Sequence, residues 1–279
     1  MGALLALASS IMWGAGDFVG GMTSRRRPAL AVYLGSQVFG FLGLVVAATV
    51  TGGWGTAPAY WPWAIAGSVA GVIGMFAFYQ ALAIGPMGIV SPLVALAVVI
   101  PVAFGLINGE TPSSLQGMGI LAAIVGVLLA SGPELSGAES AKPLGYAVVA
   151  LVFFGVMFIT IAEGSKTSPL MTMTGMRATS MVLIIVAVLV FRSKGGITPR
   201  DWPVLAFVGL LDAAANVTFG VATTLGLLST TAVLGSLYPV VTAILAAVVL
   251  KERLRPVQYV GVAVTMLGVF LVSAGAEAN

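Results

Sequence analysis

Three ionisable residues, Asp17, Arg177 and Asp212, lie within long stretches of otherwise apolar sequence. A charged side chain at the centre of a membrane costs ~2.5–3.5 kcal/mol on insertion scales, so each of them must face a cavity or a partner. Arg177 can neutralise one of the two acids as a structural ion pair, and the sequence leaves open which one. The remaining acid is suited to bind a substrate ammonium group, to carry a proton or to lie in a water-filled vestibule.

Aromatic and amide side chains accompany these charges. Trp13 precedes Asp17 by four residues and Asn216 follows Asp212 by four, which places each pair on one helix face. Each aromatic candidate could instead pack in the core or against lipid. The candidate substrate contacts are Trp13, Asp17, Tyr79, Gln80, Ser91, Arg177, Asp212, Asn216 and Tyr238. Proline bends a helix and frees a backbone carbonyl, so the candidate hinges are Pro92, Pro101 and Pro239.

The composition is typical of a membrane protein and excludes several kinds of chemistry. Hydrophobic residues form 59% of the chain and charged residues 8%, against roughly 25% charged in an average soluble domain. The absence of Cys and His excludes disulfides, thiolate or imidazole metal sites and a histidine base. Without a P-loop or a Gly-x-Ser-x-Gly motif, we expect no direct use of ATP, no enzyme, no cofactor and no metal. The net charge of +3 is too small to indicate nucleic-acid binding.

The apolar runs predict an all-α integral membrane protein with ten transmembrane helices. About 20 apolar residues are needed to cross the hydrocarbon core as a helix. Ten runs meet this length, with approximate limits 2–22, 29–51, 61–84, 87–108, 113–131, 143–163, 168–191, 203–226, 229–250 and 256–275.

Two copies of one unit make up the chain. Gly14 matches Gly155, 141 residues later, and Glu110 matches Glu252, 142 residues later. We call this separation the repeat spacing. We therefore predict a first repeat over residues 1–136 and a second over 137–279. Each repeat holds five spans, an odd number, so the second enters the membrane upside down relative to the first. Inverted repeats of this kind are typical of secondary transporters, which bind substrate at the repeat interface.

The distribution of positive charge predicts the orientation. Ten of the 12 Lys and Arg residues lie in the loops after spans one, five, seven and nine, while Lys166 lies on the opposite side. The positive-inside rule makes these four loops cytoplasmic and places both termini outside. The Arg residues at 25–27 follow the first apolar run, whereas a cleaved signal peptide carries its positive charge before the run. We therefore expect an uncleaved first helix.

Corresponding segments of the two repeats resemble the EamA-type branch of the drug/metabolite transporter superfamily. They are Asn108-Gly109-Glu110 with Gln116 and Gly119, and Lys251-Glu252-Arg253-Leu254 with Gln258 and Gly261; Trp13-Gly14 and Arg177 also fit the pattern. The resemblance covers the whole chain. It implies a basket of ten helices around a central cavity, with the first four spans of each half forming the pathway and the fifth acting as scaffold. Family members commonly keep their termini in the cytoplasm, and the charge distribution here predicts the opposite.

Glu110 and Glu252 recur at helix ends in both repeats. We expect them to hold the turn before the scaffold helix, with a gating role as the alternative.

The function that this resemblance implies is secondary transport in the inner (plasma) membrane. We expect a monomer that exports a small amphiphilic metabolite by alternating access, with amino acids, including aromatic ones, as the first choice. Asp17 or Asp212 would meet the ammonium group, and Arg177 or Asn216 the carboxylate. The alternative is proton-coupled efflux of lipophilic cations and drugs, with Asp17 as the embedded acid. The expected partners are thus the lipid bilayer and a small-molecule substrate.

The orientation can be tested by cysteine labelling, because the native chain has no Cys. We expect an Asn279→Cys variant to react with a membrane-impermeant maleimide in intact cells. Ser193→Cys, in the loop after the seventh span, should react only after permeabilisation. The reverse pattern would place the termini in the cytoplasm.

Overall fold

The computed structural model describes residues 1–24, 26–27, 29–84, 93–94, 96–130, 141–191, 196–249 and 255–277. These residues form helices and connecting turns, with no strand among them. The first repeat contains α1 (Gly2–Ser24), α2 (Ala29–Val50), η1 (Gly53–Gly55), η2 (Pro58–Tyr60), α3 (Trp61–Ile84), η3 (Leu96–Val98), α5 (Val99–Ile107) and α6 (Ser114–Ala130). The second contains α7 (Ala141–Ser165), α8 (Pro169–Phe191), η4 (Pro199–Asp201), α9 (Trp202–Thr224), α10 (Leu228–Gly235), α11 (Tyr238–Val249) and α12 (Pro256–Glu277).

Several of these helices can cross a membrane. Five are long and apolar enough by length and composition: Gly2–Ser24, Ala31–Val50, Pro58–Phe78, Lys142–Ser165 and Pro199–Thr224. Shorter apolar helices lie at other expected spans, including Ser114–Leu129 and Pro256–Val272. The all-helical membrane fold is therefore confirmed, while the count of ten spans stays a prediction.

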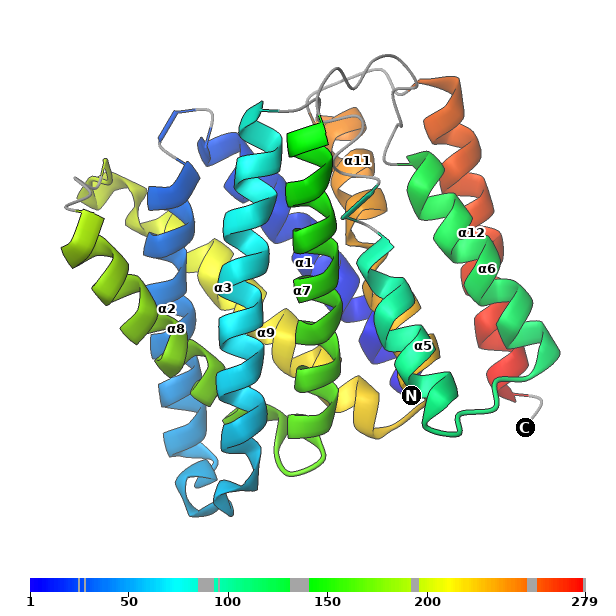
Figure 1. Ribbon diagram of the computed structural model, residues 1–279, viewed down its shortest axis with the longest axis horizontal. Coiled ribbons are helices and arrows are strands. Elements are labelled where there is room, and N and C mark those ends of the chain that lie inside the picture. The colour runs from blue at the N-terminus through cyan, green and yellow to red at the C-terminus, as the bar shows by residue number, and fades with distance from the viewer. Residues whose placement is uncertain are drawn as a thin grey trace.

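The fifth helices of the two repeats, α6 and α12, lie side by side and run in opposite directions (Figure 1). A Cβ atom added to Gly126 would overlap the backbone nitrogen of Thr265, and one on Gly268 would lie 2.5 Å from that of Ala123. At the repeat spacing, Gly126 corresponds to Gly268 and Ala123 corresponds to Thr265. The contact is thus reciprocal, as in a pair of units related by a two-fold axis.

A second reciprocal contact lies where the first helix of each repeat crosses a pathway span of the other half. A Cβ atom on Gly14 of α1 would lie 2.5 Å from Cβ of Val241 in α11. A Cβ atom on Gly155 of α7 would lie 2.6 Å from Cβ of Ile100 in α5. The repeat spacing relates Gly14 to Gly155 and Ile100 to Val241. Glycine is required at both crossings because the backbones approach too closely for a side chain.

The ninth expected span is broken in its middle. Helix α10 ends at Gly235, Ser236 and Leu237 form a turn, and α11 begins at Tyr238. Pro239 has no N–H, so it fits the first turn of a new helix but not the interior of a continuous one. The 3₁₀ turn η3, which precedes α5, occupies the equivalent place in the first repeat. Pro101 lies in the first turn of α5, and Pro92 lies outside the described residues.

The start of α1 and the end of α12 lie at the same end of the molecule, the lower end in Figure 1, which we call the terminal end. Lys166 follows α7 at this end. The opposite, basic end holds the end of α1 and the starts of α7, α9 and α12. The described cations near those helix ends are Arg26, Arg27, Lys142, Arg200 and Arg255. The expected charge asymmetry is thus present, while its assignment to the cytoplasm stays a prediction.

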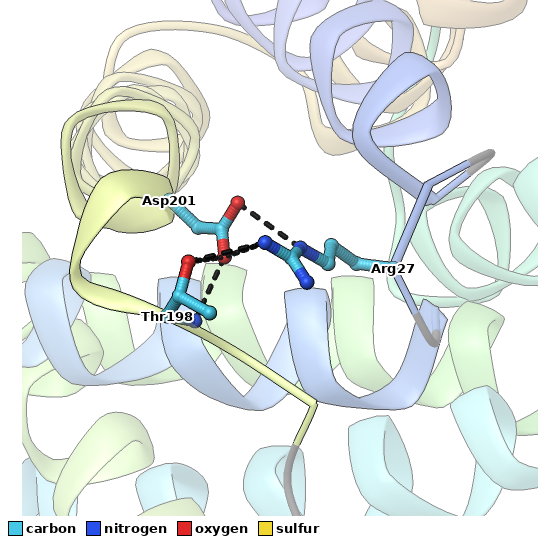
Figure 2. Close-up of polar contacts among 3 residues, drawn as sticks. All are labelled: Arg27, Thr198 and Asp201. Atoms are coloured by element: carbon cyan, nitrogen blue, oxygen red, sulfur yellow. Dashed lines mark hydrogen bonds and ion pairs between the residues drawn. The ribbon is translucent and has the colours of Figure 1, made fainter.

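At the basic end, Arg27 joins the loop after α1 to the start of α9 (Figure 2). Its Nη2 lies 3.0 Å from Oδ2 of Asp201, and its Nε donates to Oδ1 at 3.2 Å. Asp201 also accepts hydrogen bonds from the backbone N–H and the hydroxyl of Thr198, at 2.8 and 2.7 Å. The contact fixes the first turn that leads into α9 against a loop that is distant in the sequence.

These contacts predict a pH dependence of stability. The backbone N–H and hydroxyl of Thr198, followed by Arg27, hold the pKa of Asp201 below its ordinary value of 3.8. A lowered pKa in the folded state contributes stability that is complete above the unfolded-state pKa and disappears as the pH falls through the folded-state pKa. Asp201→Asn should therefore lower the thermal unfolding temperature near neutral pH, and the difference from wild type should shrink once the pH falls below 3.8.

A matched control is Glu163→Gln, which removes the ion pair with the 68% exposed side chain of Lys166. An exposed pair contributes little, so this variant should unfold close to wild type. A difference for Asp201→Asn that stays constant down to acid pH would contradict the prediction.

Candidate functional site

The central charges come from two adjacent helices of the second repeat. Arg177 of α8 donates through Nη2 to Oδ2 of Asp212 in α9. The amide of Asn216, one turn further along α9, donates to Oδ1 of Asp212 at 3.1 Å and to its backbone carbonyl at 2.7 Å. The side chains of Arg177 and Asp212 are only 14% and 31% exposed. Asp212 is therefore the acid that Arg177 neutralises, a choice that the sequence left open.

Asp17 of α1 remains without such a partner. Its side chain is exposed, and among the described residues none forms an ion pair or hydrogen bond with its carboxylate. Asp212 and Tyr238 are close enough to interact with it electrostatically. We call Asp17, Arg177, Asp212 and Asn216 the charge cluster. With both carboxylates ionised, one guanidinium and two carboxylates give it a net charge of −1, which can bind a cation.

Helix α2 adds polar side chains that the sequence analysis did not select. Tyr33 lies within electrostatic range of Arg177 and Asp212. Gln37, one turn further along, is 3% exposed, and its Oε1 has no hydrogen-bond partner in the described structure. The signal available in the sequence was that Gln37 follows Tyr33 by one helical turn within an apolar span. Neither residue is charged, so the search for charged residues in spans did not find them.

Four aromatic rings pack together beside the charge cluster. The centroid of Trp13 lies 5.5 Å from that of Phe219, 5.9 Å from that of Phe158 and 6.2 Å from that of Tyr238. Phe158 and Phe219 are themselves 5.2 Å apart. We call these four residues the aromatic layer. It joins α1 of the first repeat to α7, α9 and α11 of the second.

Sequence reasoning selected Trp13 and Tyr238 and missed Phe158 and Phe219. For Phe219 the available signal was the repeat spacing, whereas Phe158 is the repeat equivalent of Asp17 and had no such signal. The repeat spacing relates the pair Trp13 and Phe219 to Phe154 and Phe78, whose rings also pack, at 6.1 Å. A ring pair that recurs in both repeats belongs to the scaffold as well as to any binding surface.

The charge cluster lies on the basic-end side of the aromatic layer. Helix α1 runs toward the basic end, and Asp17 comes four residues after Trp13. Helix α9 runs away from it, and Asp212 comes seven residues before Phe219, or about 10 Å along the helix. On the terminal side of the layer, all eight residues of α10 are buried.

The remaining predicted residues lie elsewhere or cannot be placed. Gln80 is half-buried near the end of α3, and Pro101 is buried in α5. The side chains of Tyr79 and Pro239, and the whole of Ser91 and Pro92, lie outside the described part of the structure. The described site therefore consists of the charge cluster, the aromatic layer and the α2 side chains.

Comparison with known proteins supports the repeat organisation. The model of the EamA-like transporter family matches residues 1–132 and again residues 142–274, one match within each predicted repeat. A crystal structure of another protein is similar in fold, with a TM-score of 0.82 over 99% of this chain and 98% of that one, at 16% sequence identity. No curated protein sequence matches the chain. Since the two family matches cover nearly its whole length, the chain belongs to the EamA-like transporter family, membrane transporters of the drug/metabolite transporter superfamily.

Proposed function

We propose that the protein is a secondary transporter that exports a small amphiphilic metabolite carrying an ammonium group, with amino acids as the first substrate class. The observation that carries this proposal is the exposed carboxylate of Asp17, which has no partner among the described residues and lies near an acid that Arg177 already neutralises. An unpaired carboxylate inside a membrane protein is costly. A bound cation lowers that cost, so the site favours a positively charged ligand.

The geometry suits a zwitterion with an apolar side chain. Arg177 uses only Nη2 toward Asp212, which leaves Nε and Nη1 without a partner among the described residues. These donors can bind a substrate carboxylate while Asp17 binds the ammonium group. Tyr238 lies within electrostatic range of Asp17 and its ring packs against that of Trp13, so these two side chains can contact an apolar side chain or stack on the cation.

The broken ninth span supports alternating access as the mechanism. Transporters with inverted repeats bind substrate near the bilayer midplane, at helices that are interrupted there. Here the break between α10 and α11 lies next to Trp13 and Asp17. We propose a monomer in the plasma (inner) membrane whose two halves rock around this site.

A second candidate is proton-coupled efflux of lipophilic cations. The observation that favours it is the aromatic layer next to Asp17, an acid without a partner in the described part of the chain, since flat cations stack on such rings without needing a carboxylate group. The two functions differ in what they require of the ligand, so a set of related compounds separates them.

The substrate class can be tested with the purified full-length chain. Thermal-shift binding and counterflow in liposomes should be measured for an aromatic amino acid, its methyl ester, its N-acetyl derivative and an aromatic quaternary ammonium ion. We expect the free amino acid to stabilise the protein and to exchange, and the ester and N-acetyl forms to do neither. Uptake of the quaternary ion driven by a pH gradient would support the second candidate. Exchange of the N-acetyl form at the rate of the amino acid would exclude an ammonium site.

The two acids should respond differently to neutralisation. Asp17→Asn should weaken substrate binding by roughly 10- to 100-fold, as expected for the loss of a hydrogen bond to a charged group worth about 1.5–3 kcal/mol. Its unfolding temperature should stay near wild type, because Asp17 has no partner among the described residues. Asp212→Asn should instead lower the free energy of unfolding by about 1–3 kcal/mol, because it leaves Arg177 unpaired. Equal substrate binding by Asp17→Asn and wild type would contradict the assignment of Asp17.

A further inference from the structure

At the terminal end, a side-chain contact joins the two repeats. Glu110 lies in the turn between α5 and α6 of the first repeat, and its carboxylate reaches the first turn of α10 in the second. Oε1 accepts the backbone N–H of Leu228, and Oε2 accepts that of Ser229 at 2.9 Å. The sequence predicted that Glu110 would hold its own turn; its side chain instead accepts two hydrogen bonds from the opposite half.

The turn is shaped to present this carboxylate. The backbone N–H of Glu110 donates to the carbonyl of Gly105 at 3.0 Å. A Cβ atom on Gly105 would overlap Oε2 of Glu110, so a larger residue there would displace the side chain. Gly109 has φ of +91°, a conformation that glycine adopts without strain. These three features together direct Glu110 toward α10.

The carboxylate of Glu110 supplies hydrogen-bond acceptors for backbone N–H groups at the start of α10. The first N–H groups of a helix have no partner within it, and the positive end of the helix dipole attracts a carboxylate. All eight residues of α10 are buried, and the helix packs against α1, α5, α6 and α9. It occupies the terminal side of the aromatic layer, so movement of a substrate from the charge cluster toward this end requires α10 to shift.

A cavity beside the contact gives α10 and the carboxylate room to separate. Its volume is about 180 Å³, and its lining includes Asn108, Glu110, Thr223 and Leu228. Water entering the cavity can solvate both the released carboxylate and the freed N–H groups, which lowers the cost of breaking the bonds. The carboxylate thus has two backbone partners in this structure and a cavity beside it that water can enter.

We propose that Glu110 is a latch between the repeats that holds the terminal end of the transport pathway closed, and that its release from α10 accompanies opening toward that end. The proposal rests on alternating access in the function proposed above. Its test needs no substrate, so failure of the latch and failure of the substrate assignment are distinguishable.

Ser229 provides a reporter at the latch itself. Its side chain is 0% exposed, and its hydroxyl has no hydrogen-bond partner in the described structure, so Ser229→Cys removes no such bond. The chain contains no other cysteine. The rate at which a water-soluble maleimide labels this thiol in lipid nanodiscs then reports how often the first turn of α10 is released.

Glu110→Gln keeps the shape of the side chain but replaces one acceptor oxygen with an N–H₂ donor. In the Ser229→Cys background, we expect this change to raise the labelling rate by roughly tenfold, which corresponds to about 1.4 kcal/mol of lost preference for the closed state. The matched control is Thr265→Cys, a fully buried position at the contact between α6 and α12. It should stay protected in the Glu110→Gln background.

Two results would overturn the proposal. An unchanged labelling rate at Ser229→Cys would mean that Glu110 does not hold α10 in place. Equal acceleration at Thr265→Cys would mean that Glu110→Gln loosens the whole protein and that Glu110 is an ordinary structural residue.

Discussion

A polar group in hydrocarbon has no water to bind, and this constraint explains where the polar side chains of the molecule lie. Hydroxyl groups on the helices bond back to carbonyls of their own helix, as Ser9 does to Ala6 and Thr265 to Gly261. Arg177 and Asp212 neutralise each other, and Asn216 occupies the second oxygen of the carboxylate. Asp17 departs from this pattern, because its exposed carboxylate has no partner in the described structure. We therefore expect a ligand to bind at Asp17.

The backbone is symmetric, whereas the charges are not. Reciprocal glycine contacts join α6 to α12 and recur where α1 and α7 each cross a pathway span. The repeat equivalents of Asp17, Arg177 and Asp212 are uncharged: Phe158, Ser36 and Gly71. A symmetric scaffold allows two conformations of similar energy that expose opposite ends.

The two ends of the molecule are held by different kinds of contact. At the basic end, Arg27 and Asp201 fix a loop to the start of α9, a helix that also packs along α1 and α2. These elements form one packed group, and the contact stabilises it. At the terminal end, Glu110 joins the turn after α5 to α10 by accepting two backbone N–H groups. Contacts with few atoms beside a cavity are the ones that a conformational change can break.

The sequence by itself determined the membrane class, the helical fold and the two-unit organisation, because apolar run length and repeat spacing can be read directly from the order of the residues. It also determined that Asp17, Arg177 and Asp212 had to be near a cavity or a partner, since their burial is costly wherever they lie. Only the tertiary structure decided that Arg177 pairs with Asp212, that Phe158 and Phe219 complete a layer with Trp13, and that Glu110 binds the opposite repeat. Each of these facts depends on distances between helices far apart in the chain, and helical spacing carries no information about such distances.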